Sequence, residues 1–248
     1  MFFQVFSVLK QQWKLTALAL LFLPALINLG FWQLDRAYQK EKLLEFYEQQ
    51  NELKHTPLAY LDSLAKTKYR NVTVFGKYDI DHYWLLDNQP RQGRPGYEII
   101  MPFHFNDKMG KRHTLLVNRG WIKAEANRAS LPVIETSSEQ VSINGYLYPL
   151  QINAIINHSQ SDLAVDWPKR VLQLDNQSAA AALNEKIEAM MLRIDEDNIG
   201  AYTTQWPVIN TQPAKHQGYA VQWFAMSIAL ILLYSWFIFK EIKDKEKK

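Results

Sequence analysis

The stretch AVQWFAMSIALILLYSWFIF, residues 220–239, contains 20 consecutive residues without a charged side chain. Residues 15–34 form a second uncharged run of the same length. A helix rises about 1.5 Å per residue, so each run would extend about 30 Å, the thickness of a bilayer's hydrocarbon core. Both runs are longer than the apolar segments of ordinary buried helices, and we predict that each spans a membrane.

The first run also has features of a secretory signal peptide, because Lys10 and Lys14 give it a basic flank. Its apolar part exceeds the core of a typical signal, and no small-residue cleavage site of the A-x-A kind follows it. Pro24 and Asn28 interrupt the run, which a membrane helix tolerates where neighbouring groups satisfy the freed backbone. We therefore expect an uncleaved anchor, with a signal peptide as the alternative.

Basic residues predict the orientation of the two spans. Lysines precede the first span, and the segment KEIKDKEKK at 240–248 carries five more. Basic flanks stay in the cytoplasm, whereas long loops cross a membrane largely regardless of charge. The prediction is a multi-pass protein of the bacterial inner membrane, with both termini cytoplasmic and the main domain periplasmic. A mitochondrial origin is disfavoured, because no Arg- and Ser-rich transit segment precedes the first span.

The region between the spans begins with helix formers and changes to strand-like periodicity near residue 70. Residues 31–56 contain neither Gly nor Pro and are predicted to continue the first span as one helix. Farther along, apolar and polar residues alternate, which is typical of strands with one face on a core. The predicted strands are residues 71–78, 97–105, 114–122, 141–148 and 169–175, with a hairpin turn at 106–110.

Two of these segments predict specific packing. In the strand 97–105, alternate apolar residues should share the core face, namely Tyr97, Ile99, Met101, Phe103 and Phe105. Residues 178–192 instead carry apolar residues at helical spacing, which predicts a helix capped by Ser178. The residues at that spacing are Leu183, Ile187, Met190 and Met191.

The expected fold is an α+β membrane protein in which two transmembrane helices flank an antiparallel β-rich domain. This extracytoplasmic domain is predicted to be a curved sheet or a partly closed barrel, large enough to bury its own core. The predicted segments are a cytoplasmic N-terminus (1–14), transmembrane helix 1 (15–34), an extracytoplasmic α+β domain (35–215), an interface and transmembrane helix 2 (216–239) and a cytoplasmic basic tail (240–248).

Several classes of chemistry are excluded or disfavoured by the sequence. The chain has no cysteine, which excludes disulfides and thiolate metal sites. The six histidines include no pair at helical spacing, and neither hydrolase elbows nor phosphate-binding glycine loops occur. The net charge of +3 comes without a basic, aromatic-rich stripe, so no nucleic acid partner is expected. We therefore predict that the protein is not an enzyme; an outward-facing hydrolase is a weak alternative.

Four motifs, in this order along the chain, resemble those of the surfeit-locus (Surf-one) family of cytochrome c oxidase assembly proteins. They are G-x-W-Q-x-x-R-x-x-x-K at 30–40, RQGRPGYEIIMPF at 91–103, VNRGWI at 117–122 and H-x-x-Y-x-x-x-W-F at 216–224. DWPKRVLQLD at 166–175 adds weaker support. Together with the two-span layout, the resemblance covers nearly the whole chain.

The resemblance implies an assembly factor that helps to mature subunit I of a haem–copper oxidase, around the insertion of haem a. It implies as partners subunit I or its assembly intermediates, haem a synthase and the lipid bilayer. Some relatives bind haem a through a histidine at the start of the second span, and that position is His216 here. The resemblance thus implies His216 as an axial ligand of haem iron. The alternative is an extracytoplasmic scaffold that stabilises an oxidase subunit without binding haem.

The residues around His216 fit either interpretation. A neutral imidazole is a suitable axial ligand of haem iron. Trp223 lies two helical turns after His216 and should share its face, with Tyr219 one turn from each. Histidine, tyrosine and tryptophan are equally at home as anchors at the membrane–water interface. The pattern alone leaves both roles open.

On the first span, Trp32, Gln33 and Arg36 lie at the predicted depth of His216. They are candidates to line a cofactor groove shared with the second span, with Arg36 facing a haem propionate through charge-assisted hydrogen bonds. The alternative is an interface anchor at Trp32 and a solvated flank at Arg36.

The sequence also leaves two alternative roles for each of two features of the strand region. Alternation places Arg119 on an apolar strand face, where a charge needs a partner within the domain or a ligand. The segment RQGRPGY at 91–97 is either a turn with special backbone angles or a partner-binding loop.

Overall fold

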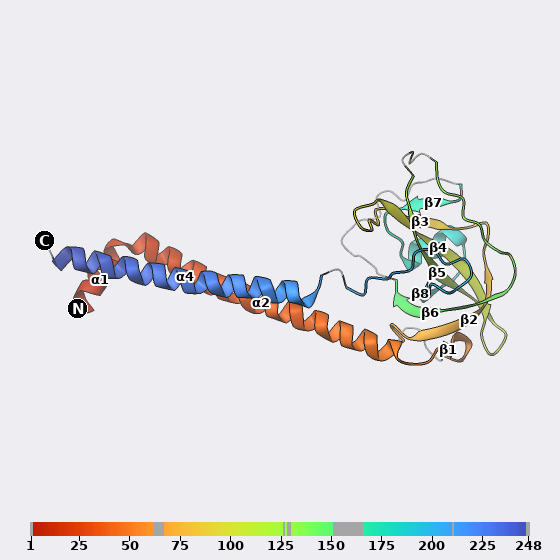
Figure 1. Ribbon diagram of the computed structural model, residues 1–248, viewed down its shortest axis with the longest axis horizontal. Coiled ribbons are helices and arrows are strands. Elements are labelled where there is room, and N and C mark those ends of the chain that lie inside the picture. Colours follow the sequence, from red (N-terminus) through yellow and green to blue (C-terminus); the bar gives the residue numbers. More distant parts are fainter. Residues whose placement is uncertain are drawn as a thin grey trace. The chain divides into compact units, whose positions relative to one another are not determined.

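A computed structural model of the chain describes residues 2–61, 67–125, 127, 130–150, 166–209 and 211–246. The chain forms two compact units. One combines Met1–Phe46 with Val208–Lys248 and is helical, and the other comprises Tyr47–Pro207 and is rich in strands (Figure 1).

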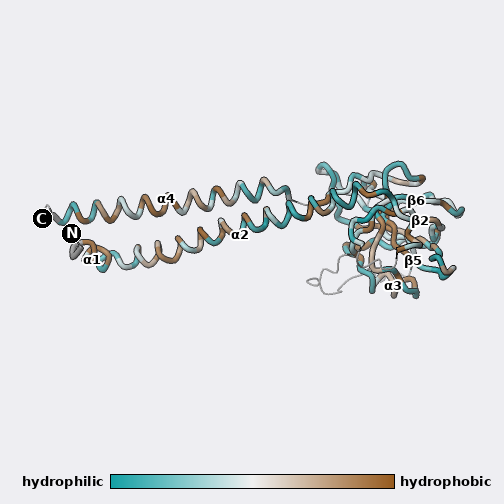
Figure 2. Tube along the Cα trace, turned by 90° about the horizontal axis from the view of Figure 1, so that it is seen from below, coloured by the Kyte–Doolittle hydropathy of each residue, from teal (hydrophilic) through white to brown (hydrophobic). Residues whose placement is uncertain are grey.

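The helical unit is built from α1 (Phe2–Gln11), the greater part of α2 (Trp13–Asn51), and α4 (Pro213–Glu246). Both α2 and α4 are long and apolar enough to cross a membrane, and brown, apolar stretches run along them in Figure 2. Only 6% of the apolar window in each helix is buried within the structure. That exposure fits a lipid environment better than the core of a soluble protein. The predicted spans 15–34 and 216–239 lie inside these helices, and their exact membrane limits stay a prediction.

Pro24 lies inside α2 without ending it. The Asn28 side chain donates a hydrogen bond to the Pro24 carbonyl at 2.8 Å. A short side-chain bond of this kind keeps polar groups satisfied within an apolar helix.

Within its described residues, the β-rich unit contains eight strands in one sheet, ordered β1-β2-β6-β8-β5-β4-β3-β7, and an additional pairing joins β2 to β4. That pairing closes β2, β6, β8, β5 and β4 into a five-stranded barrel. The strands are β1 (Thr56–Pro57), β2 (Asn71–Tyr78), β3 (Trp84–Leu86), β4 (Gly96–Asn106), β5 (Arg112–Lys123), β6 (Val141–Pro149), β7 (Lys169–Val171) and β8 (Ile187–Ile194). A 3-10 turn, η1 (Leu58–Tyr60), and a helix, α3 (Asn176–Leu183), complete the unit.

The α+β architecture predicted from the sequence is therefore confirmed, and the barrel is fully closed. Most pairings are antiparallel, including the β4–β5 hairpin across the predicted turn at 106–110. The pairs β1–β2, β3–β7 and β5–β8 are parallel. Alternation of side chains does not distinguish these two arrangements.

Two apolar clusters stabilise the barrel. The larger one fills its interior and contains all five residues predicted for the core face of strand 97–105, so that prediction is confirmed. The smaller cluster lies on the outer side of the sheet, where Ala179 of α3 packs with Trp84, Leu116 and Met191. The strands that lie between these two clusters are therefore buried on both faces.

The predicted helix at 178–192 is wrong in its second half. Helix α3 ends at Leu183, Asn184 adopts a left-handed conformation with φ 51°, and Ile187–Ile194 forms β8. Strand β8 is buried on both faces, and its continuous apolar run mimics helical spacing. The predicted cap is also wrong, because the Ser178 N–H donates to the Asp175 side chain, which caps the helix.

Candidate functional site

In the helical unit, α2 and α4 run antiparallel and approach each other through small residues. Gly30 and Ala37 are buried on α2, and Ala220 and Ser227 are buried on α4. The ring of Phe224 packs against Gly30, where an added Cβ would lie 2.5 Å from Phe224 Cε1. Small residues at helix contacts allow backbones in a membrane to approach closely.

That approach brings together two residues that the sequence placed on different helices. His216 Nδ1 lies 2.7 Å from Gln33 Oε1. An amide oxygen carries no hydrogen, so the ring nitrogen is the donor in this bond. In the neutral ring the second nitrogen, Nε2, then carries the lone pair. The sequence suggested both residues for one site but not the direct bond between them.

A second polar bond joins the same two helices near the first. Gln217 Nε2 donates to Glu41 Oε1 at 2.9 Å. Toward the other end of the helices, Tyr234 donates its hydroxyl hydrogen to Thr16 Oγ1 at 2.7 Å. The helix pair is thus held by hydrogen bonds along its length.

The other predicted site residues lie around this contact without bonding to it directly. Trp32 and Tyr219 are about half exposed, at 53% and 49%, and Trp223 is partly buried. Arg36 donates to Gln39 Oε1 on its own helix at 2.8 Å, and Gln39 in turn donates to Asp35. Whether these side chains contact a cofactor stays a prediction.

The donor set limits which metal centre could form. Among the described residues, no group of three or more His, Cys, Asp or Glu side chains is arranged to hold a metal ion. A single imidazole suits haem iron, because the porphyrin itself supplies the equatorial ligands. Trp32, the neighbour of Gln33 in the chain, and Tyr219, one turn after His216, are half exposed and offer aromatic surface. These residues therefore fit a haem better than a bare metal ion.

In the β-rich unit, Arg119 finds its partners within the domain, which settles the question left open by the sequence. Its Nε donates to Gly200 O at 2.9 Å, and its Nη1 donates to Thr136 Oγ1 at 2.5 Å. The guanidinium lies 5.0 Å from the ring centroid of Tyr78 and 5.3 Å from that of Tyr202. Burial lowers the pKa of Arg119 and raises the pKa of Tyr78 to about 12. Arg119 is a structural residue of the barrel interior.

The RQGRPGY segment has the backbone of a tight turn. Gln92 and Gly93 have positive φ angles of 50° and 75°, and Arg91 and Arg94 exchange backbone hydrogen bonds. Arg91 also lies 3.4 Å from Glu98. The turn interpretation is therefore confirmed, while partner binding by this segment remains a prediction.

A cationic and aromatic cluster on the outside of the barrel was not found by sequence analysis. The Arg193 guanidinium lies 3.6 Å from the Tyr148 ring centroid and 5.0 Å from that of Trp206. Trp206 donates its indole N–H to Ile194 O at 3.0 Å. These residues come from β6, β8 and the segment after β8, so only the strand pairing brings them together.

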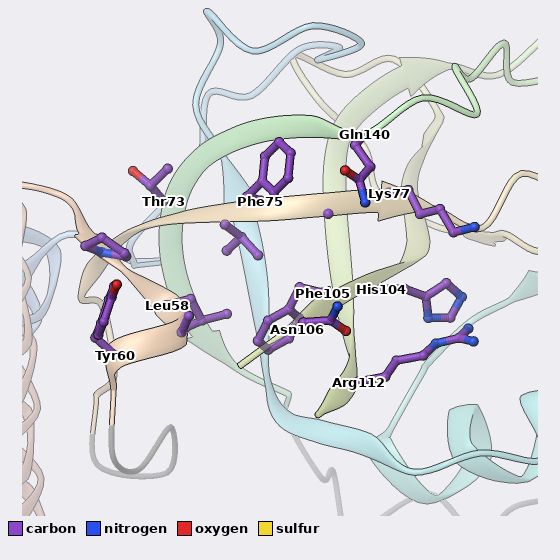
Figure 3. A pocket seen from close by; sticks show the side chains of 14 residues that line it. Leu58, Tyr60, Thr73, Phe75, Lys77, His104, Phe105, Asn106, Arg112 and Gln140 are labelled. Carbon is purple, nitrogen blue, oxygen red and sulfur yellow. The ribbon is translucent and has the colours of Figure 1, made fainter. Parts of the chain in front are cut away.

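A surface groove of about 470 Å³ lies beside the β2–β4 closure of the barrel (Figure 3). Its cationic side chains are Lys77 and Arg112, with His104 between them in this view. Phe75 and Tyr60 add exposed aromatic surface, at 62% and 67%. The described lining residues include no acidic side chain, so the groove suits an anionic or amphipathic partner.

Fold and site together define a membrane-anchored β-barrel protein whose two apolar helices present a single imidazole. The chain belongs to the SURF1 family, the surfeit-locus family that the motifs resemble, and the family model matches residues 20–228. All six predicted site residues fall inside the matched range. Membership of this family implies a role in cytochrome c oxidase assembly.

Individual relatives cover most of the chain. The chain is 28% identical over 236 residues to a SURF1-like protein of Rickettsia felis, which covers 89% of this chain and 95% of the relative. It is 28% identical over 224 residues to a SURF1-like protein of Rickettsia conorii, covering 84% and 85%. A SURF1-like protein of Rickettsia bellii is 27% identical over 223 residues, covering 84% of each chain. The likeness therefore extends over both helices and the barrel.

Proposed function

We propose that this protein is a membrane assembly factor that holds haem a at His216 while the cofactor is inserted into subunit I of cytochrome c oxidase. The observation that carries the proposal is the hydrogen bond from His216 Nδ1 to Gln33 Oε1, at 2.7 Å. It leaves Nε2 as the nitrogen with a lone pair, as an axial ligand requires.

The surroundings of His216 support the same role. Trp32, next to Gln33 in the chain, and Tyr219, one turn after His216, expose aromatic surface to which a flat apolar macrocycle can pack. Arg36, one turn after Gln33, supplies a positive charge suited to a propionate. When bound, the haem supplies an iron atom that accepts the imidazole lone pair. The protein's part is to bind the cofactor, orient the imidazole and keep the ring out of water.

The proposed location is the bacterial inner membrane, with both termini in the cytoplasm and the barrel in the periplasm. The lysines before the apolar part of α2 and after that of α4 support this orientation. Subunit I, its assembly intermediates and haem a synthase are the proposed partners. No enzymatic activity is proposed.

The test is an absorption spectrum of the full-length protein purified from cells that make haem a. We expect a haem a band in the wild type, a large loss of that band in His216→Ala, and an unchanged band in His55→Ala. His55 is a suitable control because it lies in the β-rich unit, where it pairs with Asp195 at 3.1 Å. A wild-type preparation without the band would contradict haem binding.

The groove in Figure 3 favours a second candidate function, a scaffold that binds an oxidase subunit without haem. Exposed Phe75 beside Lys77 and Arg112 is the kind of surface that anchors a partner. Reversing the charge at Lys77 and Arg112 should then abolish co-purification with oxidase subunits in cells. Oxidase activity that depends on these residues, but not on His216, would favour the scaffold over the haem carrier.

A further inference from the structure

We infer that Gln33 is a positioning residue that sets the tautomer and the orientation of the His216 ring, so that Nε2 is the nitrogen presented to iron. This inference rests on the proposed function. It assigns to Gln33 a specific role that its place in the G-x-W-Q-x-x-R-x-x-x-K motif does not by itself supply. The hydrogen bond at 2.7 Å between His216 Nδ1 and Gln33 Oε1 is the observation behind it.

A free imidazole has two neutral forms, with the proton on either nitrogen. Only the nitrogen without the proton can donate its electron pair to a metal. An acceptor held against Nδ1 favours the form in which Nδ1 carries the proton, and it also fixes the rotation of the ring. Metal-binding histidines commonly have such an acceptor on the nitrogen that does not bind the metal, and it raises the basicity of the one that does.

The packing of the two helices explains how Gln33 reaches the ring. Gly30 lies one helical turn before Gln33, and its contact with Phe224 leaves no room for a side chain between the helices. Ala220, one turn after His216, is 1% exposed. These small residues set the separation at which a glutamine can bond directly to a histidine on the facing helix.

The helix pair also contains a matched control. Gln217 Nε2 donates to Glu41 Oε1 at 2.9 Å, so this bond likewise joins α4 to α2 through a glutamine. Gln217 follows His216 in the chain and projects from a different side of the helix. Removing its amide tests the loss of an interhelical hydrogen bond without changing the acceptor at Nδ1.

The experiment compares the wild type with Gln33→Leu, Gln33→Glu and Gln217→Leu, each as the full-length chain in lipid nanodiscs. The first measurement is nitrogen NMR of haem-free protein labelled with 15N-histidine, in which the His216 signal is identified by its loss in His216→Ala. We expect a protonated Nδ1 in the wild type, in Gln33→Glu and in Gln217→Leu. We expect a mixture of both neutral forms in Gln33→Leu.

The second measurement is titration with haem a, followed by the absorption spectrum. We expect Gln33→Leu to weaken binding by about 10–100-fold, as is typical when such an acceptor is removed. Gln33→Glu keeps an acceptor and should bind within a few-fold of the wild type, with the reduction potential of the bound haem shifted downward. Gln217→Leu should match the wild type in both properties.

The outcomes separate the inference from the proposed function. A wild-type protein that takes up no haem a contradicts the proposed function. Wild-type haem binding together with an equally tight Gln33→Leu complex contradicts the inference alone. Protonation of Nε2 instead of Nδ1 in the haem-free wild type also contradicts the inference, whatever the haem titration shows.

Discussion

Gly30 of α2 and Phe224 of α4 are in direct contact, and a Cβ on Gly30 would lie 2.5 Å from Phe224 Cε1. Phe31 meets the same ring edge-on, with centroids 5.3 Å apart. The helices therefore approach each other at a glycine, one turn from the residue that bonds to His216. The geometry of the proposed site depends on this contact.

Replacing Gly30 should consequently disturb the helix pair. We expect Gly30→Leu to cost about 1–3 kcal/mol through overpacking and to separate α2 from α4 locally. Gly218→Leu is the control, because nothing lies within 4 Å of a Cβ at that position. The chain has no cysteine, so the separation can be measured by cross-linking of a cysteine pair introduced into the two helices. Equal cross-linking in both variants would contradict the close contact.

The second span can be tested by placing a charge near its centre. Ile228 is 58% exposed within the structure, as expected for a lipid-facing position. Ile228→Arg should cost roughly 2.5–3.5 kcal/mol on membrane-insertion scales. The measurement is the fraction of chains inserted, with Ile199→Arg in the β-rich unit as the control. Ile199 is 78% exposed, so its substitution should leave insertion unchanged.

The orientation makes a separate prediction about reporters. A reporter fused after Lys248 should be active in the cytoplasm, and one inserted at Lys108 should be active in the periplasm. Lys108 lies in the β4–β5 turn, where the backbone of Asp107 bonds to Lys111 and Gly110, so an insertion there spares both strands. The opposite pattern at both positions would reverse the proposed topology.

Arg119 should be essential to the stability of the barrel. Arg119→Ala removes the donors that reach Gly200 O and Thr136 Oγ1 and empties the space of a side chain that is only 2% exposed. We expect a loss of about 2–5 kcal/mol in the free energy of unfolding, as is typical when a large buried side chain is truncated to alanine. Denaturant unfolding of the full-length chain, followed by tryptophan fluorescence, measures the loss. Lys123→Ala, at an exposed position on the same strand, should change stability little.

The stability of the barrel should also depend on pH through His104. Burial is the main cause that lowers the pKa of His104 below its usual value of about 6.5, and the positive charge of Arg112 lowers this pKa further. The unfolded chain then binds more protons than the folded one, so this contribution is present above the unfolded pKa and is lost as pH falls below it. We expect the unfolding free energy of the wild type to fall between pH 7.5 and 5.5 more steeply than that of His104→Asn. Identical slopes would exclude His104 as a source of the pH dependence.

The sequence predicted the strands of the barrel well where one face is apolar and the other polar. The face of Tyr97 and Met101 was predicted correctly because polar Glu98 and His104 interrupt the apolar residues of β4, although both faces of this strand are largely buried. The sequence-based prediction failed at β8. There Met190 and Met191 are buried on opposite sides of the sheet, so apolar and polar residues do not alternate. Consecutive apolar residues of this kind remove the alternation of apolar and polar side chains on which strand prediction depends.

The side-chain contacts of the candidate site could not be predicted from the sequence either. The sequence placed Gln33 and His216 at one membrane depth, but their bond spans 183 residues and depends on helix packing that no local pattern encodes. The stacking of Arg193 on Tyr148 and Trp206 had no sequence signal, because the three residues are separated along the chain and meet only through the pairing of β6 with β8. The residue types indicated which side chains could belong to a site, but tertiary packing determines which of these side chains are in contact.

The position of β8 sets the order in which the protein can mature. It is the last strand to be synthesised, yet it lies between β6 and β5 in the middle of the sheet. Until Ile187–Ile194 is delivered, β5 and β6 each expose an unpaired edge, and such edges are prone to pairing with other chains. Only the segment between Ile194 and Pro213 then separates the completed barrel from the second apolar helix. Completion of the barrel and insertion of the helix that carries His216 are therefore nearly simultaneous events in synthesis.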